Sequence, residues 1–206
     1  MSRVTEEERN IRLIEFQRSL ANEELVAGID ESGRGPLVGP VYAACVIMDE
    51  SQPIPGINDS KKIAEKKRER IAGLIKEQAI AYGVGWATVE EIEELNILNA
   101  TRMAMHRAWV AMNVPNAFVL IDGMNPLAIG VNGKAVTGGD AKCYSIAAAS
   151  IIAKTERDAV LREMDEEYPL YGFKQHKGYG TKQHIEAIKK HGVCPHHRMS
   201  FLKNIL

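Results

Sequence analysis

Short apolar runs alternate with longer amphipathic stretches along this chain. Three of the runs are almost continuously hydrophobic, and a fourth alternates with polar positions, which is the pattern of buried and half-buried β-strands. Acidic residues or glycine follow each run, where a strand gives way to a turn or a helix. The predicted strands are residues 26–30, 41–48, 79–89 and 117–123.

The stretches between these strands carry hydrophobic residues at helical spacing, with charged residues at the remaining positions. The predicted helices are residues 5–22, 61–78, 89–112 (one or two helices), 140–168 and 181–191. Ser60 is suited to cap the second helix, and Asp140 opens the long, Ala-rich fourth helix. Residues 130–139 are expected to form a loop or short hairpin that turns at Asn132-Gly133.

Strands interleaved with helices predict an α/β fold with a mixed sheet flanked by helices and a helical C-terminal region. The length of 206 residues suits one domain with a buried core. No apolar run reaches membrane-spanning length, and the opening residues are charged and lack an apolar signal core. Three widely spaced cysteines without a CxxC pair favour reduced, buried thiols. We therefore expect a cytoplasmic protein that binds no membrane.

Charge is distributed unevenly, although the formal net charge is only −1. From Tyr171 to Leu206 there are seven lysines or arginines against one acid, and five of the six histidines lie there too. These cations are Lys174, Lys177, Lys182, Lys189, Lys190, Arg198 and Lys203. Such a distribution predicts one basic face, suited to nucleic acid, and one acidic face.

Carboxylates follow two of the predicted strands directly. The pair Asp30-Glu31 ends an apolar strand and precedes a Gly-rich turn, and Asp122 ends another strand before Gly123. Asp140 stands ahead of the Ala-rich helix. Ordinary structural roles are a solvated pair, a turn aspartate and a helix cap. Because ligand sites of α/β sheets form where strands reach their carboxyl ends, these four acids are also candidates for one site.

Four converging carboxylates would repel one another unless a cation lies between them. Oxygen ligands that leave room for several waters suit Mg²⁺ or Mn²⁺. Two such ions about 4 Å apart can activate a water and stabilise the leaving oxygen of a phosphodiester. The sequence therefore predicts a divalent-metal site for phosphodiester chemistry.

Candidate substrate contacts surround these acids in the sequence. Gly33-Arg34-Gly35 is a simple turn by itself, but beside a metal site it can approach a phosphate or a sugar hydroxyl. Tyr179, in a basic Gly-rich loop, is either a packed loop residue or a stacking surface. Lys61-Lys62 is either a solvated pair or a phosphate contact.

The histidines near the C-terminus raise the question of a zinc site. His191, Cys194, His196 and His197 have irregular spacing and include a single thiol, which is unlike the usual zinc patterns. Contact between this basic, histidine-rich region and phosphates is the favoured interpretation.

Five segments in this order together resemble bacterial ribonuclease HII, the type 2 RNase H family, from about Ala27 to Arg198. They are GIDESGRGPLVGPVYAA, INDSKK, LIDG, GDAKCYSIAAASIIAKTERD and HKGYGT. Each segment is weak evidence alone, but five in the family's order are specific. Ser32 stands where alanine is usual, and this departure removes no functional group.

The resemblance implies an RNase H-like core over about 24–168 and a C-terminal substrate-binding extension over about 169–206. The implied catalytic metal ligands are Asp30, Glu31, Asp122 and Asp140. The implied substrate-binding residues are Gly33, Arg34 and Gly35, which read the ribonucleotide and its 2′-hydroxyl, with Lys61 and the stacking Tyr179. Asp158 and Lys62 are further candidates. An unbroken helix would separate Asp158 from Asp140 by about 27 Å, so Asp158 is no ligand unless Asp140 lies outside the helix.

The implied activity is endonucleolytic cleavage of the RNA strand of RNA–DNA hybrids, and cleavage on the 5′ side of ribonucleotides embedded in duplex DNA. The products carry 3′-hydroxyl and 5′-phosphate ends, the cofactor is Mn²⁺ or Mg²⁺, and we expect a monomer. Two alternatives remain at this point. A non-catalytic nucleic-acid-binding module would not need four acids, and a metal-dependent phosphoryl-transfer enzyme for small molecules would not need the basic C-terminal region.

Overall fold

A five-stranded sheet forms the centre of the molecule. The computed structural model describes residues 5–21, 25–203 and 205. Its strand order is β3-β2-β1-β4-β5. The strands are β1 (Val26–Ser32), β2 (Val41–Ile47), β3 (Ala81–Ala87), β4 (Phe118–Asp122) and β5 (Gly133–Val136). Strands β1, β2 and β3 pair antiparallel, whereas β4 pairs parallel with both β1 and β5. The predicted mixed sheet is confirmed.

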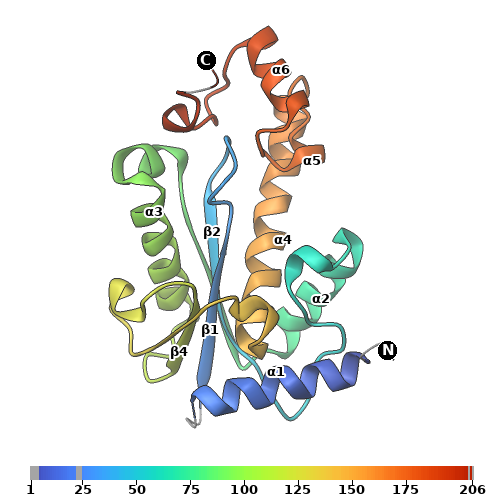
Figure 1. Cartoon of the computed structure of the whole chain (residues 1–206), viewed down its shortest axis with the longest axis vertical. Helices are drawn as coiled ribbons and strands as arrows, with labels where there is room; N and C mark the ends of the chain where they lie inside the picture. Colours follow the sequence, from blue (N-terminus) through green and yellow to red (C-terminus); the bar gives the residue numbers. More distant parts are fainter. Residues whose placement is uncertain (1–4, 22–24, 204, 206) are drawn as a thin grey trace.

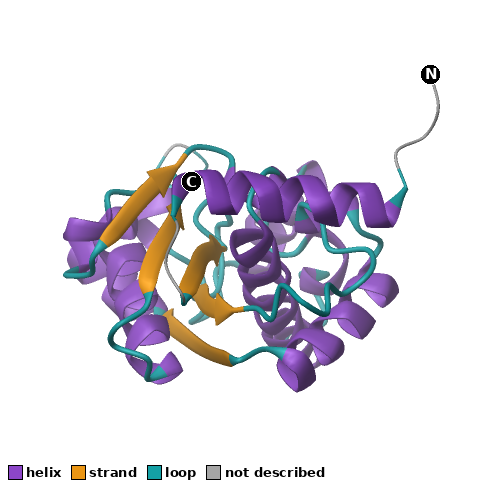
Figure 2. Cartoon of the chain, turned by 90° about the horizontal axis from the view of Figure 1, so that it is seen from below, coloured by secondary structure: helices purple, strands orange, loops and turns teal. Residues whose placement is uncertain are grey.

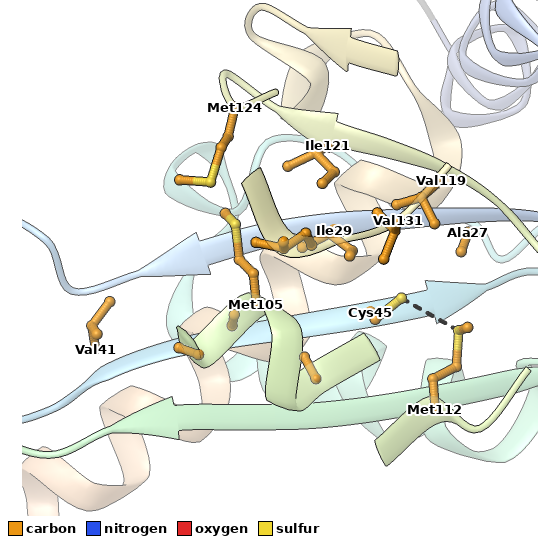
Figure 3. Close-up of a cluster of buried hydrophobic side chains, with 14 of the residues drawn as sticks. Ala27, Ile29, Val41, Cys45, Met105, Met112, Val119, Ile121, Met124 and Val131 are labelled. Carbon is orange, nitrogen blue, oxygen red and sulfur yellow. Dashed lines mark hydrogen bonds between the residues drawn. The ribbon is translucent and has the colours of Figure 1, made fainter. Parts of the chain in front are cut away.

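Helices cover both faces of this sheet (Figures 1 and 2). The helices of the described part of the chain are α1 (Glu6–Leu20), α2 (Glu65–Gln78), α3 (Val89–Met112), α4 (Tyr144–Glu167), α5 (Phe173–His176) and α6 (Lys182–His191). Helix α3 buries one face of β1, β2 and β4, and Figure 3 shows this cluster with Met105 and Met112 against the strands. Helices α1, α2 and α4 bury the other face.

Helix α4 packs on β1 at a distance that only glycine allows. A β-carbon added at Gly28 would lie 2.1 Å from the backbone carbon of Ser145. Because α4 begins at this contact, the segment that precedes the helix is held beside β1. The helix then runs along the sheet to the C-terminal segments (Figure 1).

Several boundaries differ from the sequence-based prediction. Strand β1 continues through the acids to Ser32, which pairs with Tyr42. The predicted cap Ser60 is wrong, since residues 60–62 form a 3-10 turn capped by Asp59, and α2 begins only at Glu65. The predicted helix over 5–22 corresponds to α1, and residue 22 lies outside the described residues. Helix α3 is interrupted at Asn96.

Two further corrections concern the segment between β4 and α4. Of the loop or short hairpin expected at 130–139, the hairpin is wrong, because β5 pairs in parallel with β4 and not with a preceding antiparallel strand. Asp140 does not open the long helix; it lies in a 3-10 turn, Gly139–Ala141, and α4 begins at Tyr144. This turn frees Asp140 from the helix axis, so the helix length does not fix its position.

The segments after α4 pack against the loop that follows β1. Leu37 and Val38 of that loop share an apolar cluster with Leu161 of α4 and Ile188 of α6. The C-terminal segments therefore support the loop that carries Gly33-Arg34-Gly35. None of the helices in the described residues is long and apolar enough to cross a membrane.

Candidate active site

Two of the predicted acids lie side by side at the ends of neighbouring strands. The register pairs Ile29 of β1 with Ile121 of β4, so Asp30 and Asp122 follow at the same edge of the sheet. Asp30 is buried, with 6% of its surface exposed, and its Oδ1 accepts a hydrogen bond from the amide of Glu31 at 2.7 Å. The parallel pairing of β1 and β4 thus brings these acids together.

Asp140 joins them through the turn that precedes α4. The amide of Gly139 donates a hydrogen bond to Oδ1 of Asp122 at 2.7 Å, which fixes the turn against the end of β4. Nζ of Lys61 lies 3.4 Å from Oδ2 of Asp140, so the 3-10 turn of residues 60–62 also reaches this point. The structure therefore brings together all four acids that the sequence singled out.

Burial and neighbouring carboxylates raise the pKa of Asp30, Glu31 and Asp122. Burial is the largest cause of the raised pKa of Asp30, and the charges of Glu31, Asp122 and Asp140 raise it further. Burial also raises the pKa of Glu31, although Arg34, 3.2 Å away, opposes the shift. For Asp122, burial raises the pKa and the Gly139 amide partly offsets it. The cations and amides near this end of the sheet therefore do not fully compensate the negative charge of the carboxylates.

This donor set fits a divalent cation of the Mg²⁺ or Mn²⁺ type. The donors are all carboxylate oxygens, which such hard cations prefer. In the described part of the chain, no three ligating side chains already converge on one point. Arg34 and Lys61 instead pair with Glu31 and Asp140. Bound cations would relieve the repulsion that now raises these pKa values.

A cavity of about 500 Å³ opens beside the acids. It is lined by Asp30, Glu31, Ser32, Gly33, Arg34, Gly35, Ser60, Lys61, Glu65, Arg68, Lys154, Asp158, Lys177 and Tyr179. Tyr179 is 48% exposed, and a β-carbon added at Gly35 would lie 3.5 Å from its Cε1 atom. The tyrosine ring therefore lies against the glycine loop, where it can stack on a sugar or base.

The two further candidates occupy different positions. Asp158 lies at the cavity but is 1% exposed, and its carboxylate pairs with Arg68 at 2.8 Å and Lys154 at 2.5 Å. Lys62 pairs with Asp59 at 3.5 Å and lines a separate cavity near α1. The structure thus places Asp158 in a charge-paired wall of the site and leaves Lys62 away from it.

The basic C-terminal region is less exposed than its sequence suggests. Arg198 is fully buried, and Lys177 pairs with Glu65 at 2.9 Å. His184 and His197 are buried and hydrogen-bonded to each other at 3.2 Å, so the expectation that the histidines contact phosphates is wrong for these two. The sequence shows how many basic residues this region has, but it does not show which of them are buried.

Sequence reasoning missed the buried arginines and the lysine of the site wall. Lys154 directly follows ten mainly apolar residues of α4, residues 144–153, and a cation at such a position is the one signal of a special role. Arg157 and Arg68 look like ordinary surface cations in the sequence, although Arg157 is buried and Arg68 compensates Asp158 in the structure.

A mixed sheet of this order, with carboxylates at adjoining strand ends and helices on both faces, defines the RNase H-like class of nucleases. The family model described as Ribonuclease HII matches residues 27–204, and the chain belongs to that family. The protein is a ribonuclease H, an endonuclease that hydrolyses RNA in RNA–DNA hybrids. This assignment excludes the non-catalytic module and the small-molecule enzyme.

Curated relatives and solved structures agree with this assignment. The chain is 52% identical to ribonuclease HII of Acetivibrio thermocellus over 183 residues, which cover 89% of this chain and 72% of the relative. It is 49% identical to that of Caldanaerobacter subterraneus, covering 97% and 85% of the two chains. Ribonuclease H2 from Pyrococcus horikoshii superposes with a TM-score of 0.71 at 25% identity, covering 88% and 96%.

A more distant structure shares the fold alone. It is the Bst ribonuclease HIII in complex with Mn²⁺, with a TM-score of 0.68 at 18% identity, covering 89% of this chain and 65% of the other. The ribonuclease H family depends on divalent metal ions.

Proposed function

We propose that Asp30, Glu31, Asp122 and Asp140 are the catalytic metal ligands, and that the protein cuts 5′ of ribonucleotides embedded in duplex DNA as well as RNA in hybrids. The observation that carries this proposal is that the four acids, from β1, β4 and the turn before α4, lie near one another and beside the glycine loop. Cleavage would leave 5′-phosphate and 3′-hydroxyl ends.

The chain's own groups would hold the reactants in place. Bound divalent ions, two in this proposal, would activate the attacking water and stabilise the leaving oxygen. The carboxylates would hold these ions, and Gly139 would hold Asp122 through its amide. Lys61, 3.4 Å from Asp140, is placed to contact a phosphate once the cations have compensated the carboxylates.

Selection of RNA is assigned to the loop directly after β1. Gly33, Arg34 and Gly35 line the cavity, where their backbone would reach a ribose and its 2′-hydroxyl. Tyr179 would supply a stacking surface next to Gly35. Asp158 and its cationic partners would shape the wall of this site and would not bind metal. Lys62 stays a weaker candidate for a phosphate contact.

We further propose a cytoplasmic, monomeric protein that uses Mn²⁺ or Mg²⁺. Either Mn²⁺ or Mg²⁺ suits the carboxylate set. A monomer is sufficient because every candidate site residue comes from one chain. A cytoplasmic setting is supported by three buried, unpaired thiols. Residues 24–168 would form the catalytic core of a single domain, and residues 169–206 the extension that supports the reading loop.

The test is cleavage of a DNA duplex that carries one ribonucleotide, beside an all-DNA duplex. The wild-type protein should cut only the first, at the 5′ side of the ribonucleotide, and only with Mn²⁺ or Mg²⁺. Asp122→Asn should lower kcat by about a hundredfold or more, since one charged ligand of the reacting centre is removed. Binding of the duplex should change little. Wild-type kcat in this variant, or cleavage in EDTA, would disprove the metal-ligand assignment.

A further inference from the structure

Two fully buried arginines converge on the loop that follows β1. Arg198 is 0% exposed and Arg157 is 1% exposed. Among the described residues, every hydrogen-bond acceptor of the two guanidinium groups is a backbone carbonyl oxygen. Burying a cation without a carboxylate partner is costly, so this arrangement needs a compensating purpose.

Arg198 forms five of these hydrogen bonds, all with one short segment. Its Nη2 donates to the carbonyl oxygens of Gly33 at 2.7 Å and Gly39 at 2.6 Å, and its Nε donates to Gly39 at 2.8 Å. Its Nη1 donates to Arg34 at 3.2 Å and Pro36 at 2.9 Å. One planar guanidinium therefore fixes the carbonyl directions of four residues.

These bonds also determine where the amides of the loop point. In a trans peptide the N–H lies opposite the C=O. Because the carbonyls of Gly33 and Arg34 point toward Arg198, the N–H groups of Arg34 and Gly35 point away from it. Neither amide has a hydrogen-bond acceptor among the described residues. Gly33, Arg34 and Gly35 line the cavity beside the acids. We infer that the two free N–H groups, which point away from Arg198, are available to a ligand in that cavity.

Arg157 connects the same loop to the segment that carries Tyr179. It donates to the carbonyl oxygens of Val38 at 3.1 Å and Pro40 at 3.2 Å, and also to Lys177 at 3.0 Å. The amide of Leu37 donates to Gly178 at 2.8 Å, which joins the two segments a second time.

Gly33 leaves the space that Arg157 needs. A β-carbon at Gly33 would lie 2.2 Å from Nε of Arg157, and its φ of +104° also favours glycine. Burial lowers the pKa of Arg198 to about 9 and that of Arg157 to about 10. Both side chains therefore keep their charge and their donors at neutral pH.

We propose that Arg198 and Arg157 are positioning residues for ribose recognition. Arg198 would orient the amides of Arg34 and Gly35 toward the 2′-hydroxyl of the substrate, and Arg157 would hold the Tyr179 segment against them. This inference rests on the proposed role of the glycine loop. It adds that the backbone that recognises the ribose is held in place by Arg198, which lies 163 positions after Gly35 in the sequence.

The experiment measures binding in EDTA of two duplexes that differ only in one 2′-hydroxyl. Arg198→Lys keeps the charge but loses the planar fork. It should weaken binding of the ribonucleotide duplex by about tenfold, as expected for misdirected hydrogen bonds, and leave the all-DNA duplex nearly unaffected. Arg198→Met should behave like Arg198→Lys. If Arg198→Lys binds the ribonucleotide duplex like the wild-type protein, only the charge of Arg198 matters and the positioning role is wrong.

The matched control is Ile188→Ala, which removes a buried side chain from the same apolar cluster without touching the hydrogen bonds of the loop. It should lower Tm and leave the ratio of the two dissociation constants unchanged. If Arg198→Lys lowers Tm but also leaves that ratio unchanged, its role is structural only and the inference is wrong. Should Arg198→Lys fail to fold, Arg157→Lys gives the same readout and the same criterion.

The outcomes also separate this inference from the proposed function. If the wild-type protein binds both duplexes equally, the glycine loop does not read the sugar, and the inference fails with that role. Cleavage at the ribonucleotide by the wild-type protein would still support the proposed catalytic site. If cleavage is absent but binding discriminates and Arg198→Lys abolishes the discrimination, the positioning role stands and the catalytic assignment fails.

Discussion

At the scale of single residues, Asp158 is an acid of the cavity that compensates buried cations and is not expected to bind metal. Its carboxylate compensates both Arg68 and Lys154 in the cavity wall. Asp158→Asn would leave two partly or fully buried cations unpaired, so we expect a loss of about 3–5 kcal/mol of unfolding free energy at neutral pH. Chemical denaturation measures this loss.

The same variant tests whether Asp158 binds metal. The Mn²⁺ concentration for half-maximal cleavage should stay at the wild-type value in Asp158→Asn. Asp122→Asn should raise it, because a charged ligand is lost. An increased metal requirement in Asp158→Asn would place this carboxylate among the ligands, contrary to its ion pairs.

Residue identity made the acids predictable but not their surroundings. Asp30 and Asp122 could be found because each follows an apolar strand, and parallel pairing then aligns the strand ends. Asp140 was found as a residue but misplaced at a helix start, since a 3-10 turn of three residues has no distinctive pattern. Arg198 was counted among surface cations because a list of charges does not show which of them are buried.

At the scale of elements, the contact between β1 and α4 positions the turn that holds Asp140. Gly28→Ala would place a methyl group 2.1 Å from the backbone of Ser145, so β1 and α4 would have to separate. We expect a loss of several kcal/mol of stability, as for an overpacked core, together with reduced kcat. Thermal unfolding and the cleavage assay measure the two effects.

Gly73→Ala is the matched control for this substitution. Gly73 lies in α2, and a β-carbon there would meet nothing within 4 Å. The change should stabilise the protein by about 0.5–1 kcal/mol, because alanine favours a helix over glycine. Equal Tm values for the two alanine variants would contradict the close packing at Gly28.

Elements were predictable where a long pattern supported them. The four predicted strands and the main helices follow from apolar runs or helical spacing over five or more residues. Strand β5 was missed because it has four residues, of which only Val136 is buried. Its parallel partner β4 stabilises it, and such a tertiary interaction leaves little trace in a short segment.

At the scale of the whole molecule, a buried pair of neutral histidines makes the C-terminal segments sensitive to acid. The amide of Cys194 donates to Nδ1 of His197 at 2.9 Å, so Nε2 of His197 carries the proton shared with Nε2 of His184. Nδ1 of His184 then donates to the carbonyl oxygen of Tyr179 at 3.0 Å. Burial lowers the pKa of His184 to about 4 and also lowers that of His197.

The pH dependence of stability follows from this shift. Between the ordinary histidine value of 6.5 and about 4, the unfolded chain binds a proton that folded His184 does not. Stability is therefore complete above pH 6.5 and declines as the pH falls toward 4. His184→Gln should flatten this decline in a series of Tm measurements, whereas the exposed control His191→Gln should not. Identical slopes in all three proteins would rule out His184 as the source.

The 24-residue helix α4 also fixes the distance between its contact with β1 and its contacts with the C-terminal segments. Its first turn lies against Gly28, and further along it presents Arg157, Asp158 and Leu161 to three different partners. One residue inserted between these points would rotate everything beyond it by about 100° and advance it by about 1.5 Å. Arg157, Asp158 and Leu161 would then lose their contacts at the same time. We therefore expect α4 to tolerate substitutions better than insertions or deletions. The number of residues in α4 between these contacts therefore determines whether the helix can pack on Gly28 and hold the loop after β1 at the same time.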